Sequence, residues 1–408
     1  MNTNYFKRSY FVIAFFSLSL GFVACSDDDD DTVTPTATDP NAGLKSEIKA
    51  NYADIVYASY EDSYNEALEL QTAINAFTLS PTQAGFDNCK QKWLDAREPY
   101  GQTEAYRFAN GPIDAENGPE GLLNAWPLDE GFVDYVVGNA TTGLINNPSA
   151  YPNLNSNILD SLNETGGDKN ISVGYHAIEF LLWGQDDPNT ALKTPGNRPY
   201  TDYLTAGGTA SNQARRAEYL KLSASLLVGH LKTMKDTWDA SKSNNYYATF
   251  MNLTNDEALT NILTAIGTLS KSELATERME AALKQQDQEE EHSCFSDNTH
   301  RDMILNAQGI RNIYIGEYNR VDGSIVSGKS IQDLIALVNS TLEGELNTLS
   351  STSMTQVNAI PIPFDFSLTQ EVLGGLGPIQ TVIITLQSQG DKISELASAL
   401  GITISTDL

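Results

Sequence analysis

Histidine is rare in this chain, and three of its four histidines lie beside carboxylates in two short segments. In the first segment, GYHAIE, His176 and Glu179 are three residues apart. On a helix this spacing puts both side chains on one face, where they can bind one cation together. The nearby Gly174 allows a ligand or another backbone to approach closely. The alternative is a core histidine that is hydrogen-bonded to its helical neighbour.

The second segment, residues 289–302, combines three consecutive glutamates with two histidines. Asp297 and His300 repeat the spacing of three between a carboxylate and a histidine, and Glu291 precedes His292 directly. An acidic helix end followed by a capped turn would explain the segment without any ligand. Consecutive glutamates are, however, unfavourable near a helix C-terminus, where the helix dipole is negative. We therefore expect a cation or an arginine to offset them.

A third segment, AREPYGQTEAYRF, carries Arg97, Glu104 and Arg107 around a proline. Pro99 removes a helical hydrogen bond, so a kink is expected there. The charged groups supply either ion pairs between helical bundles or oxygen ligands, and the structural role is favoured. The fourth histidine, His230, lies on an apolar stripe and is assigned to packing.

Apolar residues recur at helical spacing along most of the chain, which predicts an all-α protein built from helical bundles. Helices are expected at 44–79, 83–108, around 171–184, 210–240, 256–290, 300–320, 329–349 and 367–400. Residues 110–170 are rich in Gly, Pro and Asn and are expected to form long ordered loops with short helical pieces, which are usually functional. Thr299 and Asp302 have the spacing of a capping box for the next helix. No segment is assigned to a sheet.

The N-terminus has the pattern of a secretory signal. Lys7 and Arg8 precede a short apolar run that ends in small residues before Cys25, and the run is too short to span a membrane. We assign residues 1–24 to a signal peptide and Cys25 to lipidation, because the sequence before it resembles a lipobox. Residues 25–42, acidic and then rich in Thr and Pro, form a tether. An outer-membrane lipoprotein is expected, on the periplasmic side or the cell surface.

The formal net charge of −28 argues against nucleic acid and anionic lipid surfaces as partners and favours cations. Beyond Cys25, the chain has Cys89 and Cys294. Export makes a disulfide between them feasible, and two free buried thiols are equally compatible with the sequence. There is no phosphate-binding glycine loop and no GxSxG motif, which excludes the usual nucleotide-binding sites and serine hydrolases.

Taken together, these segments resemble the imelysin family. GYHAIEFLLWG matches the GxHxxE signature of that family, and AREPYGQTEAYRF with GPEGLLNAWPLDE is similar to its N-terminal block. The stretch from Glu289 to Tyr318 is similar to its C-terminal block. The resemblance implies two helical domains that arose by duplication, here 43–205 and 206–408. It also implies a functional site between them, lined by the residues of the signature.

Relatives in the imelysin family are tied to iron uptake, and the family is named for a reported insulin-cleaving metallopeptidase. The resemblance therefore implies a binding protein for a metal ion, with iron favoured and zinc also suited, or for an iron-bearing ligand. The membrane, through the lipid anchor, and other iron-uptake components are candidate partners. The expected metal ligands are His176, Glu179, Asp297 and His300, and the expected lining residues are Gly174, Glu104, Arg107, Glu291 and His292.

Two other functions stay open. One is a metallopeptidase, although HxxE supplies at most two ligands and no spare base, where a zinc hydrolase needs three ligands and a base. The other is a surface lipoprotein that binds a protein or a glycan, with the His/Glu cluster purely structural. Whether the chain is an enzyme is left undecided by the sequence.

Overall fold

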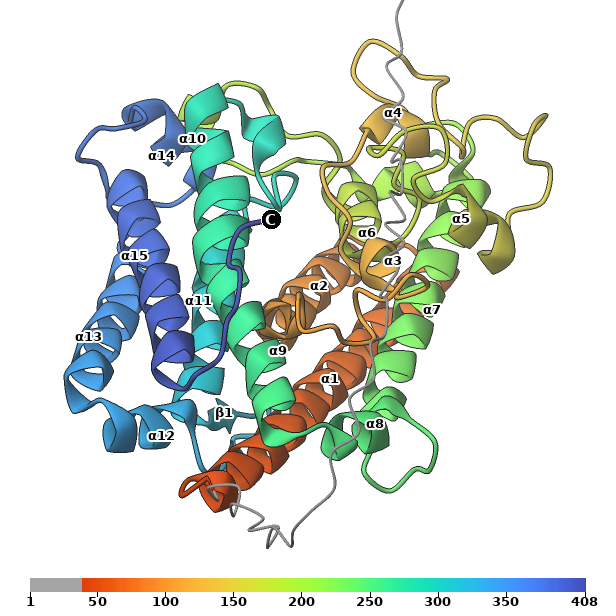
Figure 1. The fold of residues 1–408 in the computed structure, drawn as a ribbon. Helices are drawn as coiled ribbons and strands as arrows, with labels where there is room; N and C mark the ends of the chain where they lie inside the picture. The colour runs from red at the N-terminus through yellow and green to blue at the C-terminus, as the bar shows by residue number, and fades with distance from the viewer. Residues whose placement is uncertain (1–38) are drawn as a thin grey trace, which may run out of the picture. The chain divides into compact units, whose positions relative to one another are not determined.

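Helices make up most of the computed structural model, which describes residues 39–408 (Figure 1). The all-α prediction is therefore confirmed. The predicted signal peptide, the lipidation site Cys25 and most of the predicted tether lie outside the described residues. Residues 40–408 form one compact unit by their contacts. The predicted boundary at residue 205, and the duplication, remain predictions.

The first part of the described chain packs around one long helix. Helix α1 lies against α2 and α7, and α6 lies against α2 and α7. The long elements are α1 (Ala42–Leu79), α2 (Gln83–Thr103), α6 (Gly174–Trp183) and α7 (Gln213–Thr237). The short ones are η1 (Glu104–Tyr106), α3 (Glu120–Leu123), α4 (Glu130–Val133), α5 (Ser156–Leu162), η2 (Thr190–Leu192) and η3 (Tyr200–Tyr203). The loop-rich stretch predicted for 110–170 is confirmed, with α3, α4 and α5 as its helical pieces.

The second part is built on the C-terminal helix, α15, which packs against η4, α13 and α9. Its elements are α9 (Asn255–Thr268), η4 (Leu269–Glu280), α10 (Ala281–Gln285), η5 (Gln288–Glu290), α11 (Thr299–Ile315), α12 (Ile331–Val338), α13 (Ser340–Val357), α14 (Phe364–Gln370) and α15 (Pro378–Ala399). Helix α8 (Tyr246–Asn252) contacts α1. None of these helices, within residues 39–408, is long and apolar enough to cross a membrane.

Helix α2 and helix α11 approach each other through glycines, and this contact joins the two parts. A side chain at Gly309 of α11 would clash with the backbone carbonyl of Gln102 and would come within 3.1 Å of the Ala105 side chain. On the other helix, a Cβ atom at Gly101 would lie 2.8 Å from Leu305. The absence of side chains lets the two backbones pack closely.

The structure differs from the sequence-based expectations in several elements. The helix predicted for 256–290 is divided into α9, a π-helical stretch and α10. A small antiparallel hairpin, β1 (Glu317–Asn319) with β2 (Ile325–Ser327), was not predicted. Helix α2 continues through Pro99, as expected, but it ends at Thr103 and is followed by η1, whereas the predicted helix ran to residue 108. Both Cys89 and Cys294 are buried and free, so no disulfide joins them.

The capping box predicted at Thr299 and Asp302 is wrong. Asn298 is the N-cap residue of α11, and it makes no capping hydrogen bond with its side chain. The Thr299 hydroxyl accepts a hydrogen bond from the backbone N–H of Ser293 at 3.0 Å. The Asp302 carboxylate instead binds Arg97. A local capping rule is overridden here because the carboxylate compensates a buried cation.

His230, which was assigned to packing, also differs from expectation. Its ring nitrogen Nε2 lies 3.1 Å from the Asp160 carboxylate at a partly exposed position on α7.

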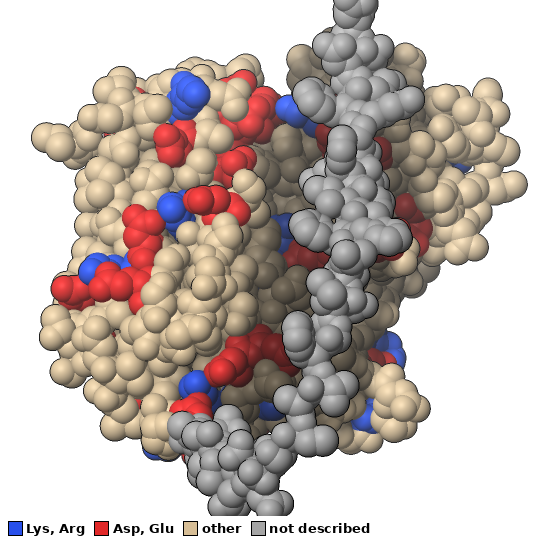
Figure 2. All heavy atoms as spheres, in the orientation of Figure 1, with Lys and Arg blue, Asp and Glu red and all other residues tan. Residues whose placement is uncertain are grey.

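Figure 2 shows Asp and Glu side chains spread over one face of the described chain, with fewer Lys and Arg among them. This distribution agrees with the strongly negative net charge.

The close approach of α2 and α11 predicts the effect of adding a methyl group. We expect Gly309→Ala to reduce the free energy of unfolding by about 1–3 kcal/mol, because backbone atoms must move to admit it. The matched control is Gly344→Ala on α13, where a Cβ atom would meet no atom within 4 Å. That variant should gain about 0.5–1 kcal/mol, since alanine is the better helix former. Urea denaturation measures both. A Gly309→Ala variant as stable as the wild type would contradict the close contact.

Candidate functional site

Helix α6 begins at Gly174, and the backbone needs glycine there. Gly174 has a φ of +87°, and a Cβ atom would lie 2.7 Å from the carbonyl oxygen of Leu123. Glycine adopts this left-handed conformation without steric cost. Gly174 therefore allows the start of α6 to pack closely against the end of α3.

His176 and Glu179, one turn apart on α6, form the expected pair. The Nδ1 atom of His176 lies 2.8 Å from Oε2 of Glu179, and both side chains are almost completely buried. The other carboxylate oxygen of Glu179 accepts hydrogen bonds from the backbone N–H and the hydroxyl of Ser296, at 2.9 and 2.7 Å. The Nε2 atom of His176 is buried and has no hydrogen-bond partner among the described residues. One nitrogen of the ring is thus fixed and the other is available to a ligand.

His292 faces His176 from the loop before α11. The centroids of the two imidazole rings are 4.9 Å apart, and the indole of Trp126 lies 5.5 Å from the ring of His292. The Nδ1 atom of His292 lies 3.0 Å from Oδ2 of Asp302. The structure therefore brings together histidines from the first and second sequence segments.

A chain of buried polar contacts surrounds the two rings. Arg97 of α2 donates to Oδ1 of Asp302 at 2.7 Å and to Oδ1 of Asn124 at 2.6 Å. The amide nitrogen of Asn124 donates to Glu104 at 3.1 Å, and Arg278 donates to the other oxygen of Glu104 at 2.7 Å. Two ion pairs, linked by Asn124, therefore hold four separate segments of the chain in place.

Burial and these charges set the protonation of the site. Burial and the positive charge of Arg97 lower the pKa of His176 to about 3, and burial with Arg278 lowers that of His292 to about 3. Burial also opposes ionisation of Glu104, but Arg278 and Arg107 outweigh it and lower the pKa of Glu104 to about 2. Both imidazoles are therefore neutral at pH 7, which is the form that binds metals.

Glu179 differs from Glu104 and Asp302, whose pKa values are lowered. Burial raises its pKa to about 8, although the hydrogen bonds from Ser296 oppose this shift. The pair of His176 and Glu179 is thus uncharged as a whole at pH 7. A cation bound at the ring would displace one proton from the pair.

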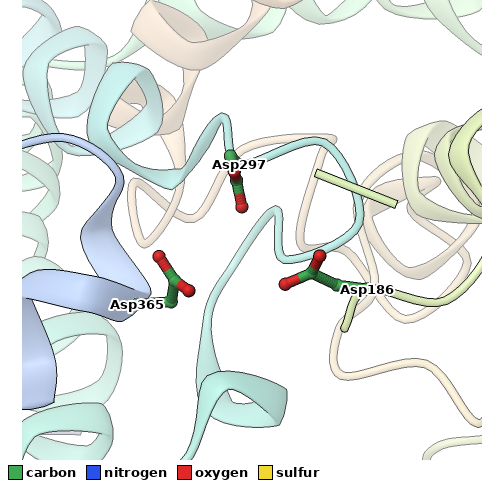
Figure 3. Close-up of side chains that lie close together, drawn as sticks. All are labelled: Asp186, Asp297 and Asp365. Carbon is green, nitrogen blue, oxygen red and sulfur yellow. The ribbon is translucent and has the colours of Figure 1, made fainter. Parts of the chain in front are cut away.

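The remaining residues predicted for the site have other partners. Arg107 is paired with Glu104 at 3.4 Å and with Glu120 at 3.2 Å. The Nδ1 atom of His300 lies 3.0 Å from the backbone carbonyl oxygen of Asp297. The Asp297 side chain lies close to Asp186 and Asp365 (Figure 3). Glu291 is buried, and its backbone carbonyl accepts a hydrogen bond from the indole of Trp126.

Within residues 39–408, the three aspartates are the one group of three or more His, Cys, Asp or Glu whose ligand atoms lie within 4.8 Å of one another. His176, Glu179 and His292 do not form such a group in this geometry. The donors at the two rings, imidazole nitrogen and carboxylate oxygen, nevertheless suit a transition-metal ion.

Sequence reasoning missed several residues of the site. Asp302 stood inside the second segment but was assigned to a helix cap, and Asn124, Trp126 and Ser296 were not singled out. Arg278 lies on the π-helical stretch and offered no sequence signal. A buried ion pair between residues 205 positions apart, as with Arg97 and Asp302, has no local pattern that could have indicated it.

Comparisons with known proteins agree with this architecture. The family model described as imelysin, of peptidase family M75, matches residues 56–391. The chain is 25% identical over 348 residues to iron-regulated protein A of Synechococcus elongatus, covering 82% of each sequence. A crystal structure of an iron-regulated protein A precursor from Parabacteroides distasonis is similar in fold, with a TM-score of 0.68 at 18% identity. The match covers 89% of this chain and 97% of that one. Because the family model spans most of the sequence, the chain belongs to the imelysin family.

Proposed function

We propose that this chain is an exported lipoprotein of iron uptake that binds a metal ion, or an iron-bearing ligand, at His176 and Glu179. It is proposed to be anchored through Cys25 to the outer membrane. The site lies among buried polar residues of α2, α6 and α11.

The observation that carries the proposal is the unpaired ring nitrogen of His176. A buried polar atom without a partner costs about 1–3 kcal/mol, so such atoms are rare unless a ligand completes them. Histidines that bind metals commonly donate their other ring N–H to a carboxylate, which fixes the ring and makes it a better ligand. His176 has this arrangement, with Nδ1 on Glu179 and Nε2 without a partner.

The donor set favours an ion that brings ligands of its own. With Glu179 bound to Nδ1 of His176, this pair offers an ion one protein ligand, Nε2, whereas a zinc hydrolase uses three protein ligands and leaves one position for water. An iron-bearing ligand, or an ion that keeps several waters, fits so few protein donors better than a zinc hydrolase site does. In this geometry the Asp297 carboxylate, which the sequence suggested as a further ligand, lies with those of Asp186 and Asp365. His300, the other suggested ligand, contacts the backbone carbonyl of Asp297 through Nδ1.

The assignment to iron rests on the family and on the relatives named iron-regulated protein A. Imidazole and carboxylate groups suit iron, zinc and manganese alike. The excess of acidic residues attracts any of these cations toward the protein. A metallopeptidase remains the rival function, and the following experiment separates the two.

Metal binding by the purified protein tests the site. We expect the wild type to bind about one transition-metal ion and His176→Ala to weaken that binding at least about 100-fold, since it removes the ligand nitrogen. The matched control is His230→Ala, which removes a partly exposed histidine paired with Asp160. Elemental analysis and titration calorimetry measure the stoichiometry and affinity, and circular dichroism checks that each variant is folded.

Two results would count against the proposal. The first is a wild-type protein that takes up no metal ion, and the second is a folded His176→Ala variant that binds as tightly as the wild type. Chelator-sensitive cleavage of a peptide by the zinc-loaded protein would favour the metallopeptidase instead.

Protonation of Glu179 predicts how binding depends on pH. Its pKa of about 8 means that the carboxyl holds a proton at pH 7, and a cation on His176 releases it. We expect about one proton to be released per ion at pH 7, and the affinity to rise roughly tenfold per pH unit up to about pH 8. Calorimetry in buffers of different ionisation enthalpy measures the proton. The Glu179→Gln variant should release none, and an equal release from both proteins would refute this link.

The lipid anchor predicts a membrane-bound protein. Cys25→Ser should leave the membrane fraction and lack acyl chains, since the thiol is the proposed attachment point. Cys89→Ala, which removes a buried thiol, should stay in the membrane fraction. Cell fractionation and mass spectrometry of the N-terminal peptide distinguish these outcomes. A Cys25→Ser protein that remains acylated would exclude the anchor.

A further inference from the structure

Three aspartates from distant segments converge beside the histidine site. Asp186 follows α6, Asp297 precedes α11, and Asp365 lies in the first turn of α14. One carboxylate oxygen of each lies within 4.8 Å of the others. Figure 3 shows the three carboxylates pointing toward a common space. The chain thus folds three negative groups together, against their mutual repulsion.

Oxygen atoms in this cluster lack partners. The Oδ1 atoms of Asp186 and Asp365 are both buried without a hydrogen bond, and Asp365 is only 4% exposed. A fourth acid, Glu291, is 1% exposed and also has an unpaired oxygen, Oε1. Burial, and after it the charges of the three aspartates, raise the pKa of Glu291 well above its usual value. Buried carboxylate oxygens are costly to leave unpaired, so either protons or a cation must neutralise them.

The described residues supply little compensating charge. Burial raises the pKa of Asp365, and Lys193 opposes this shift without cancelling it. The ammonium group of Lys193 lies 3.4 Å from the centroid of the Phe366 ring. Burial and the neighbouring carboxylates raise the pKa of Asp186 and of Asp297 to about 7. The described residues around the cluster therefore leave most of its negative charge unbalanced.

We propose that Asp186, Asp297 and Asp365, with Glu291 beside them, bind a calcium ion. All the available donors are carboxylate oxygens, which hard cations prefer, and there is no imidazole or thiolate in the group. Calcium binds oxygens at about 2.3–2.6 Å and accepts irregular geometry, so two ligands of one ion lie up to about 5 Å apart. The separations in the cluster fall within that limit. Magnesium is a poorer match, because it keeps its waters and demands an octahedron.

The ion would support the histidine site without being part of it. Asp297 follows Ser296, whose backbone N–H and hydroxyl both bind Glu179. Asp297 has a φ of +58°, a left-handed conformation that is uncommon outside glycine, asparagine and aspartate. A calcium ion at its carboxylate holds this turn against α14 and against the loop after α6.

Calcium titration of the purified protein, stripped with a chelator, tests the proposal. We expect one ion to bind, with a dissociation constant in or below the range of about 0.1–1 mM typical of extracellular calcium modules. Asp365→Asn should weaken binding at least about tenfold, because it removes one charged ligand. Asp187→Asn is the matched control, since this exposed neighbour on the same loop lies outside the cluster. His176→Ala should bind calcium normally, so this site can be present or absent independently of the proposed function.

Thermal unfolding gives a second, independent reading. In chelator, Asp365→Asn should be at least as stable as the wild type, because it removes one of three repelling charges. Calcium should raise the melting temperature of the wild type and of Asp187→Asn, and leave that of Asp365→Asn unchanged. Four results would each overturn the assignment: no binding up to about 10 mM calcium, equal affinity in Asp365→Asn, tighter binding of magnesium, or destabilisation of Asp365→Asn in chelator.

Discussion

Arg97 and Asp302 form an ion pair with almost no access to water, at 1% and 0% exposure. Taking two charges out of water costs several kcal/mol each, so the fold must hold them in good geometry and satisfy their remaining donors and acceptors. Asn124 meets the guanidinium, and His292 and Ser293 meet the carboxylate. The pair therefore constrains α2, α11 and the loops that flank them at the same time.

This constraint explains the chemistry available at the two imidazoles. The second buried pair, Glu104 with Arg278, repeats the arrangement on the other side of Asn124. Both arginines disfavour a positive charge on the neighbouring rings, and burial acts in the same direction. Because both pKa values lie far below 7, the rings are neutral at pH 7. Neutral rings of this kind suit metal binding and do not suit proton transfer. Both ion pairs are almost completely buried.

The helices were predictable because their apolar faces repeat with the helical period, a signal contained in each segment. The division of the predicted helix 256–290 and the hairpin near residue 320 could not be predicted from the sequence, because both depend on packing against distant helices. The pairing of His176 with Glu179 was predictable too, because their spacing of three residues on a helix is also a local pattern. The capping rule failed at Asp302. This residue has the spacing from Thr299 of a capping residue, but its carboxylate binds Arg97, which is 205 positions away in the sequence. The groups that complete the site come from contacts that no short pattern contains.

The turn at residues 293–298 connects the two constellations and separates their chemistries. Ser293 and Ser296 point their hydroxyls at Asp302 and Glu179 in the polar network, while Asp297 turns its carboxylate toward Asp186 and Asp365. A group with ring nitrogens therefore lies on one side and a group with only carboxylate oxygens on the other. Since nitrogen donors favour transition metals and oxygen donors favour hard cations, the two sites would not compete for one ion. Ordering the turn at one side would also fix Ser296, and with it the carboxylate that orients His176.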